Sequence, residues 1–174
     1  MAEIFLVNGE GGVGKTTLVE YFLKHPLKDV VFFDFDKGKY ELPKESSLWK
    51  EWKDKQQRWW LTFFKEYVVK HPERHIVLCG VVAFPWKLEL MDEYKELENA
   101  HFHFAFLTCS DEERKRRLEE RGDGHLWKPK AENILEIEER MRGLGAREIE
   151  TSIKTVEEVA KDVSSWILGS ATRL

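Results

Sequence analysis

Five short runs of consecutive apolar residues, rich in β-branched and aromatic side chains, recur along the chain. They are Ile4–Asn8, Val30–Phe35, Ile76–Val82, Phe102–Thr108 and, less marked, Ile149–Ile153. Continuous apolar runs of this length, without polar alternation, are typical of strands that are covered on both faces of a parallel sheet. The pattern therefore predicts five buried parallel strands.

Segments with helical spacing of apolar residues separate these runs. We expect helices at Thr16–Lys24, from Ser47 to Val69, from Ser110 to Gly122, after Pro129, and from Thr155 to about Leu168. The third and fifth begin with capping boxes. The alternation of strands and helices predicts a three-layer α/β/α fold with a five-stranded, doubly wound parallel sheet. No repeat or linker divides the chain, so we expect one domain over residues 1–174.

Composition and charge limit the classes of partner that the protein can bind. The formal net charge is −4, with 42% hydrophobic and 34% charged residues, which argues against a nucleic-acid binder or an anionic-membrane binder. No apolar run approaches the roughly 20 residues that span a bilayer, and the N-terminus lacks the basic segment of a signal peptide. The two cysteines, Cys79 and Cys109, lie in apolar runs and are expected as buried, reduced thiols. These features favour the cytoplasm and no membrane partner.

A glycine-rich segment follows the first predicted strand directly. It reads Gly9-Glu10-Gly11-Gly12-Val13-Gly14-Lys15-Thr16 and fills every fixed position of the phosphate-loop pattern G-x-x-x-x-G-K-[ST]. In such a loop the backbone N–H groups and the following helix N-terminus bind phosphates. Lys15 reaches the β/γ oxygens, and the Thr16 hydroxyl binds Mg²⁺. The predicted nucleotide-binding residues are Gly9, Gly11, Gly12, Val13, Gly14, Lys15, Thr16 and Thr17.

Two observations narrow the class of nucleotide-binding protein. The loop also resembles that of ParA/MinD-type ATPases, but their signature lysine would fall at position 10, where this chain has Glu10. No Asn-Lys-x-Asp guanine-specificity motif occurs in the chain, which argues against a GTPase. The expected cofactors are ATP and Mg²⁺.

Two carboxylates follow the second apolar run. Asp34 and Asp36 are two residues apart, so on a continuing strand they would point to the same side. Ligands of open α/β sheets bind at the carboxyl ends of strands. One carboxylate there can hold Mg²⁺ while the other accepts a proton from a substrate hydroxyl.

A strand, a phosphate loop, a helix and a second strand ending in Asp-x-Asp resemble the shikimate kinase and gluconate kinase group of small P-loop kinases. Wider relatives are nucleoside monophosphate kinases and chloramphenicol phosphotransferase-like enzymes. The resemblance implies that Asp34 lies near Mg²⁺ and that Asp36 contacts the acceptor hydroxyl. The run Ile76–Val82 ends without the Asp-Gly of nucleoside monophosphate kinases, which makes the chain more similar to sugar-acid kinases.

The basic segment after the fourth strand resembles the helix that enters the lid of these kinases. The resemblance implies a short helical lid at about 121–142, with Arg117 near the nucleotide and Arg121 on the transferring phosphoryl group. Arg140 and Arg142 are second candidates for phosphate binding. A solvated helix, with its arginines paired to neighbouring glutamates, is the alternative. The resemblance also places Ser152–Thr155 beside the adenine ring.

Aromatic residues crowd the second predicted helix. They are Trp49, Trp52, Trp59, Trp60, Phe63, Phe64 and Tyr67. Their helical spacing, and the mixture of acidic and basic residues between them, favours core packing over base stacking in a nucleic-acid site. Some of these rings remain candidates for the wall of an acceptor pocket.

Three functions are compatible with these residues. The first is a phosphotransferase that moves the γ-phosphoryl group of ATP to a hydroxyl of a small molecule, with Lys15, Asp36 and Arg121 in catalytic roles and with Thr16 and Asp34 on the metal. The second is a nucleoside or nucleoside monophosphate kinase. The third is a regulatory protein that binds nucleotide and hydrolyses it slowly or not at all.

Overall fold

A computed structural model of the chain describes residues 2–80, 84–97, 100–129 and 132–171. Its sheet contains β1 (Ala2–Gly9), β2 (Val30–Asp34), β3 (His75–Cys79), β4 (Ala100–Thr108) and β5 (Arg147–Glu150). The strands lie in the order β2-β3-β1-β4-β5, and all neighbouring pairs are parallel. The predicted five-stranded parallel sheet is confirmed.

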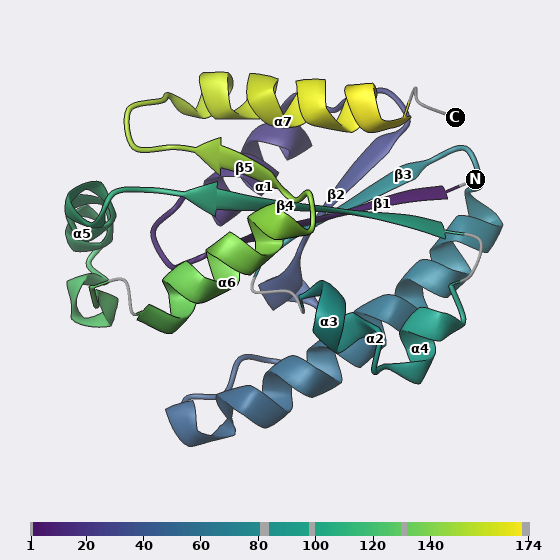
Figure 1. Cartoon of the computed structure of the whole chain (residues 1–174), viewed down its shortest axis with the longest axis horizontal. Helices are drawn as coiled ribbons and strands as arrows, with labels where there is room; N and C mark the ends of the chain where they lie inside the picture. Colours follow the sequence, from purple (N-terminus) through teal and green to yellow (C-terminus); the bar gives the residue numbers. More distant parts are fainter. Residues whose placement is uncertain (1, 81–83, 98–99, 130–131, 172–174) are drawn as a thin grey trace.

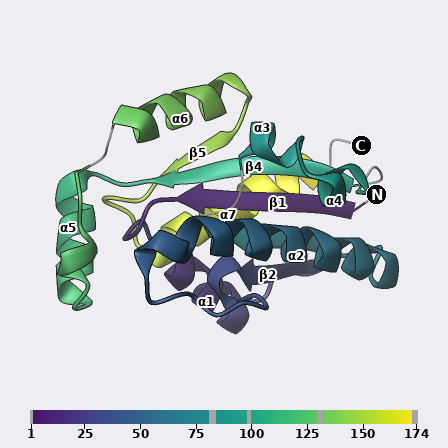
Figure 2. The ribbon, with the colours of Figure 1, turned by 90° about the horizontal axis from the view of Figure 1, so that it is seen from below.

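Helices cover both faces of this sheet. The longer ones are α1 (Lys15–Lys24), α2 (Trp49–Lys70), α5 (Asp111–Glu120), α6 (Glu132–Gly143) and α7 (Val156–Ala171). The short ones are α3 (Pro85–Leu88), α4 (Asp92–Lys95) and the 3₁₀ turns η1 (Phe35–Lys37), η2 (Ser46–Leu48) and η3 (Gly124–Leu126). Figures 1 and 2 show α1 and α7 on one face, α2 and α6 on the other, and α5 beyond the carboxyl ends of the strands. Within the described residues, no helix is long and apolar enough to cross a membrane.

Alternation along β1 divides the core into two clusters. Phe5 and Val7 are fully buried against α1 and α7. Ile4 and Leu6 point to the opposite face and are fully buried in a cluster that includes residues of α2. A strand that is apolar on both faces is what a central parallel strand requires, so the continuous apolar pattern of this run has a direct structural cause.

The structure confirms the predicted capping box before α7, whereas before α5 only the serine cap forms, because Ser110 N donates to Ser152 Oγ at 2.7 Å instead of to Glu113. Ser110 Oγ accepts a hydrogen bond from Glu113 N at 3.2 Å, at the start of α5. Before α7, Thr155 Oγ1 accepts from Glu158 N at 3.3 Å, and the Glu158 carboxylate accepts from Thr155 N at 2.8 Å. These bonds satisfy backbone donors that have no partner inside the helix.

The prediction for the last strand was wrong by about two residues. The strand is Arg147–Glu150 rather than Ile149–Ile153, and Ile153 is 91% exposed in the turn before α7. The reason is that β5 is an edge strand, paired only with β4. Its outer positions are polar, and only Ile149 is buried. The predicted third strand ends earlier too, at Cys79, and residues 81–82 of that prediction lie outside the described ranges.

The aromatic residues of α2 are mainly core residues, as predicted. Trp52, Trp60 and Phe64 are buried, whereas Trp49 is 38% exposed. The buried indoles also hold the segment after β2: Trp60 Nε1 donates to Phe35 O at 3.1 Å, and Trp52 Nε1 donates to Tyr40 O at 3.0 Å.

Gln56, buried on the same helix, completes this attachment. Its side-chain amide donates to Phe35 O at 2.9 Å and accepts from Tyr40 N at 3.0 Å. Because buried polar groups are costly when unpaired, these bonds fix the backbone on either side of Asp36. The helix α2 thereby positions one edge of the site described next.

Candidate functional site

The glycine-rich loop joins β1 to α1 in a conformation that other residues adopt with strain. Gly12 and Gly14 have φ angles of 85° and 101°, in the left-handed region that favours glycine. A Cβ atom on Gly12 would also lie 3.2 Å from Leu118 Cγ and 3.3 Å from Arg114 O. Both the turn and the close packing of α5 against the loop therefore require glycine at position 12.

Lys15 begins α1 and folds back over the loop. Its Nζ donates to Gly9 O at 2.6 Å and to Glu10 O at 2.7 Å. The ammonium group is therefore held at the inner side of the loop, where bound phosphates would meet the backbone N–H groups. Thr16 and Thr17 follow in the first turn of the helix and are exposed.

The charge of Lys15 is held in a largely desolvated position. Burial lowers the pKa of Lys15 to about 8, although Asp36, Cys79, Asp34 and Glu10 act in the opposite direction. Burial also raises the pKa of the Cys79 thiol to about 12, so this group is neutral near pH 7. The negative charges that act on Lys15 are therefore the carboxylates of Asp34, Asp36 and Glu10. These groups lie near one another at the carboxyl edge of the sheet.

The two aspartates are close together, but their predicted arrangement on one strand was wrong. The strand β2 ends at Asp34, and Asp36 lies in the 3₁₀ turn η1. Asp34 Oδ1 caps that turn by accepting from Asp36 N at 3.1 Å. The side-chain alternation of a strand no longer applies beyond Asp34, because an aspartate that caps a turn ends the strand.

The environments of the two carboxylates differ. Asp34 is only 9% exposed, whereas Asp36 is exposed at the edge of the sheet. Although the residue is exposed, partial desolvation of its carboxyl by surrounding atoms raises the pKa of Asp36, and the neighbouring Asp34 raises it further, while Lys15 and Lys53 oppose that rise. A carboxylate with a raised pKa is better matched to accepting a proton than an ordinary aspartate.

The residues expected to bind a metal supply oxygen atoms only. In the described part of the chain, no group of three or more His, Cys, Asp or Glu side chains could hold a metal by itself. The hydroxyl of Thr16 and the carboxylate of Asp34 nevertheless fit Mg²⁺, because this ion usually takes one or two protein oxygens and completes its shell with phosphate and water.

A cavity of about 150 Å³ lies beside the loop. It is lined by Val13, Gly14, Thr17, Leu18, Arg117, Thr151, Lys154, Val156 and Val159. Of the residues predicted to lie beside the adenine ring, Ser152–Thr155, Lys154 lines this cavity. The wall also includes Thr151, which the sequence analysis missed because a single threonine after a strand gives no distinctive pattern.

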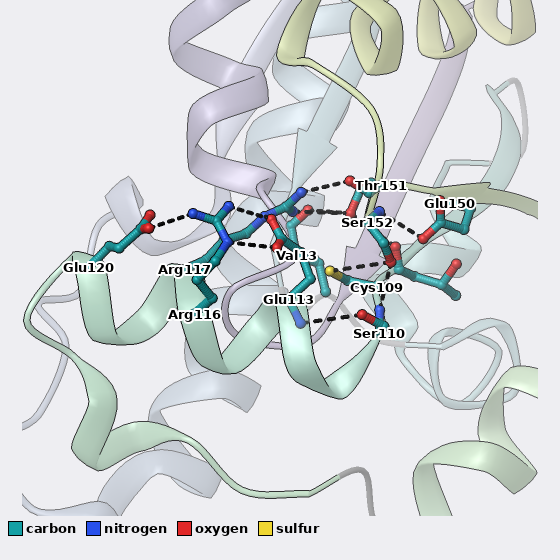
Figure 3. A network of polar contacts seen from close by, with 11 residues as sticks. Val13, Cys109, Ser110, Glu113, Arg116, Arg117, Glu120, Glu150, Thr151 and Ser152 are labelled. Carbon is teal, nitrogen blue, oxygen red and sulfur yellow. Dashed lines mark hydrogen bonds and ion pairs between the residues drawn. The ribbon is translucent and has the colours of Figure 1, made fainter.

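Arg117 forms one side of this cavity, and Figure 3 shows the polar contacts that hold its side chain. Its guanidinium donates to Thr151 O at 2.6 Å and to Thr151 Oγ1 at 3.2 Å, and its Nε donates to Glu113 Oε1 at 2.8 Å. Thr151 Oγ1 also lies 3.2 Å from Val13 O and 3.0 Å from Thr108 O. One hydroxyl thus joins the phosphate loop, β4 and α5.

Replacing Thr151 with valine keeps the side-chain shape and removes this hydroxyl. We expect Thr151→Val to lower the free energy of unfolding by about 1–2 kcal/mol, because buried partners lose their hydrogen bonds. Urea denaturation measures the change. The control is Thr62→Val, at an exposed position of α2 where the hydroxyl donates to Arg58 O of the preceding turn. Equal losses in the two variants would contradict this role for Thr151.

The other predicted arginines have partners away from the loop. Arg121 Nε pairs with Asp123 Oδ2 at 2.7 Å, and its side chain is 55% exposed. Arg142 pairs with Glu148 at 2.7 Å, and the Arg140 guanidinium lies 4.0 Å from the centre of the Trp86 ring. The alternative of a solvated helix paired to neighbouring glutamates describes Lys115, which pairs with Glu119, and Arg116, which pairs with Glu113 and Glu120; Arg121 pairs with an aspartate instead.

Arg114 is the charged residue of α5 that approaches the loop most directly. Its Nε donates to Gly11 O at 3.2 Å, and the residue is only 4% exposed. Its place among four consecutive basic residues does not distinguish it in the sequence. Its spacing of four residues from the buried Leu118 places it on the inward face of the helix, and that spacing was the available signal.

Comparison with known proteins agrees with this geometry. The sequence profile of the AAA_18 family, described as an AAA domain, matches residues 5–142. The chain belongs to this family. A search among curated proteins finds no significant match.

Three solved structures share the fold over nearly their whole length. A gluconokinase from Sinorhizobium meliloti 1021 is 14% identical with a TM-score of 0.56, and 98% of each chain is covered. The tunicamycin resistance protein of Deinococcus radiodurans is 19% identical with a TM-score of 0.53, and 96% of each chain is covered. Shikimate kinase from Acinetobacter baumannii is 17% identical with a TM-score of 0.51; coverage is 98% of this chain and 95% of that one. This AAA_18 protein therefore has the fold of the small P-loop kinases.

Proposed function

We propose that this AAA_18 protein is an ATP-dependent kinase that transfers the γ-phosphoryl group of ATP to a hydroxyl of a small molecule. The observation that carries the proposal is the meeting of Lys15, Asp34 and Asp36 at the carboxyl edge of one parallel sheet. A loop that only binds nucleotide needs the lysine, whereas transfer to a hydroxyl also needs a group that orients or deprotonates the acceptor.

Each part of the nucleotide has a counterpart in the site. The loop from Gly9 to Thr17 would surround the phosphates, and the cavity beside Arg117 would take the base. Lys15 would leave the carbonyl groups of Gly9 and Glu10 and bind the β/γ oxygens. Mg²⁺ held by Thr16 and Asp34 would neutralise phosphate charge when bound.

The acceptor would lie beside Asp36. Its hydroxyl donates a hydrogen bond to the Asp36 carboxylate, which takes the proton as the new oxygen–phosphorus bond forms and the bond to ADP breaks. Lys53 on α2 is half-buried near this carboxylate. Burial lowers the pKa of Lys53, and Lys87 lowers it further while Asp36 opposes the change. Lys15 and Lys53 therefore both contribute positive potential at the Asp36 carboxylate, on the acceptor side of the site.

The proposal treats residues 1–174 as one domain whose lid comprises about 121–142, that is, η3 and α6 with the segments next to them. Closure of this lid would bring Arg121 to the transferring phosphoryl group and exchange its ion pair with Asp123 for phosphate. Charge neutralisation by such an arginine stabilises the transition state.

The test is ADP release from Mg-ATP in the presence of sugars, sugar acids, nucleosides and nucleoside monophosphates in turn, with GTP as a second donor. Stimulation by one hydroxyl compound, absent in Lys15→Ala, supports the proposal. Stimulation restricted to nucleosides or their monophosphates would assign the nucleoside-kinase alternative. Slow hydrolysis that no acceptor changes would overturn the kinase proposal and favour a regulatory protein.

The depressed pKa of Lys15 predicts a pH dependence of nucleotide binding. Phosphate needs the ammonium form, which the free protein loses as pH rises through about 8. Affinity for Mg-ATP, measured by calorimetry on either side of pH 8, should therefore fall above it, approaching about tenfold per pH unit. In Lys15→Arg the affinity should be weaker but independent of pH in this range, because a guanidinium stays charged. Equal slopes in the two proteins would contradict the prediction.

A further inference from the structure

An acidic residue occupies the second position of the phosphate loop. Glu10 lies between Gly9 and Gly11, and the negative charge of its carboxylate acts to raise the pKa of Lys15. A carboxylate in a phosphate-binding loop repels a nucleoside triphosphate, because neighbouring like charges interact unfavourably even near a protein surface. A loop built to bind phosphate therefore has to neutralise this side chain.

Arg114 of α5 provides the opposite charge. Its Nη1 lies 3.0 Å from Glu10 Oε2 and 2.8 Å from Asp111 Oδ1. The side chain of Arg114 is 5% exposed and that of Glu10 is 21% exposed. The guanidinium also donates to Gly11 O at 3.2 Å. Arg114 thus contacts two consecutive loop residues and one residue of its own helix.

The backbone of the loop rests on the same part of α5. A side chain at Gly12 would approach Arg114 O and Leu118 Cγ to 3.3 Å and 3.2 Å, so no space separates loop and helix there. Moving the loop away from α5 would leave the buried guanidinium of Arg114 without these partners, and an unpaired buried charge strongly destabilises the fold. The guanidinium therefore fixes the position of the loop relative to the helix. Figure 1 shows that this helix lies beyond the strand ends.

We propose that the Glu10–Arg114 ion pair adapts the phosphate loop to a nucleoside triphosphate: Arg114 neutralises Glu10 and holds the Glu10–Gly11 backbone in place. Arg114 is then a positioning residue for nucleotide binding. This inference rests on the proposed function, because its ligand is the Mg-ATP of that reaction. Glu10 occupies a variable position of the loop pattern, and Arg114 lies in the same basic segment as Arg117 and Arg121, so neither residue is marked by the motif itself.

The most direct test changes Glu10 and leaves the buried arginine intact. Glu10→Gln removes the negative charge and keeps the side-chain length, so its affinity for Mg-ATP should equal or exceed that of the unmodified protein. Glu10→Asp keeps the charge but shortens the side chain by one methylene, which separates it from Arg114 and leaves a carboxylate facing the phosphates. Calorimetric titration with Mg-ATP should show about tenfold weaker binding for Glu10→Asp than for Glu10→Gln.

A second pair of variants tests Arg114 itself. Arg114→Gln should bind Mg-ATP about tenfold more weakly, and adding Glu10→Gln should recover most of this loss, because the loop then no longer carries a carboxylate. A merely structural arginine would give no such recovery of affinity. Thermal unfolding of each variant identifies those that fold, and if Arg114→Gln does not fold, the comparison of Glu10→Asp with Glu10→Gln decides.

The outcomes separate this inference from the proposed function. Equal affinities of Glu10→Asp and Glu10→Gln, or a double variant that binds no better than Arg114→Gln, would overturn the role of the ion pair. Both results leave the kinase proposal standing if the unmodified protein binds Mg-ATP and Lys15→Ala does not. Absence of Mg-ATP binding by the unmodified protein would overturn both.

Discussion

Lys15→Ala is expected to lower acceptor-stimulated ADP release by at least about 10²- to 10³-fold, the loss associated with removal of a single preorganised transition-state contact. The ammonium group of Lys15 already lies inside the loop, 2.6 Å from Gly9 O and 2.7 Å from Glu10 O. Exchanging these neutral carbonyl groups for phosphate oxygens pairs the ammonium with negative charge, so both partners of the bond are then ionised and the interaction is stronger. Alanine offers neither the charge nor the reach.

The same substitution should leave the fold intact. Desolvation lowers the pKa of Lys15, so its burial opposes folding in the charged form, and removing the group costs little stability. Urea denaturation of Lys15→Ala should show a change within about 1 kcal/mol. Lys15→Arg is the matched control: it keeps the charge but not the compact ammonium geometry and should recover only part of the activity. Turnover in Lys15→Ala within tenfold of the unmodified protein would refute the assigned role.

Local patterns predicted the sheet and the loop because their causes are local. The strand β1 is apolar on both faces since it is central, and the glycines at 12 and 14 are required by their own φ angles. The side-chain caps before α5 and α7 also involve residues only three positions apart. Such features can be read from a few consecutive residues.

The missed residues acquire their roles through distant contacts. Arg114 meets Gly11 across 103 residues, and Thr151 meets Val13 across 138. A run of basic residues on a helix has the same local appearance whether one of them is buried or all are solvated. Only the packing of α5 against the loop makes Arg114 different from its neighbours Lys115 and Arg116.

Asp36 illustrates an intermediate case. Its presence at the carboxyl edge of the sheet was predictable, because ligands bind there in parallel α/β folds. Its orientation was not, since the chain leaves the strand at Asp34 and turns into η1. The attachment of that turn to α2 depends on Gln56 and Trp60, which gave no recognisable signal of this role.

Asp36→Asn is expected to lower turnover by about 10²- to 10⁴-fold, the usual contribution of a positioned general base. The amide keeps the size of the side chain but cannot take the hydroxyl proton. Affinity for Mg-ATP should change little, because Lys15 and the loop bind the phosphates. Turnover and calorimetric titration of the same preparation separate these two effects.

Asp34→Asn provides the comparison that distinguishes the two carboxylates, and the pH profile of kcat/KM shows the difference. Partial desolvation of the carboxyl and the negative charge of Asp34 raise the pKa of Asp36. Activity should therefore begin to fall at a higher pH than it would with an ordinary aspartate, whose pKa is about 3.9. Removing the charge of Asp34 lowers the pKa of Asp36 and moves this acid limb to lower pH, while the Mg²⁺ concentration needed for activity rises. Asp36→Asn should lack the limb altogether. An unchanged acid limb in Asp36→Asn would mean that another group takes the proton, since an asparagine amide does not titrate in this range.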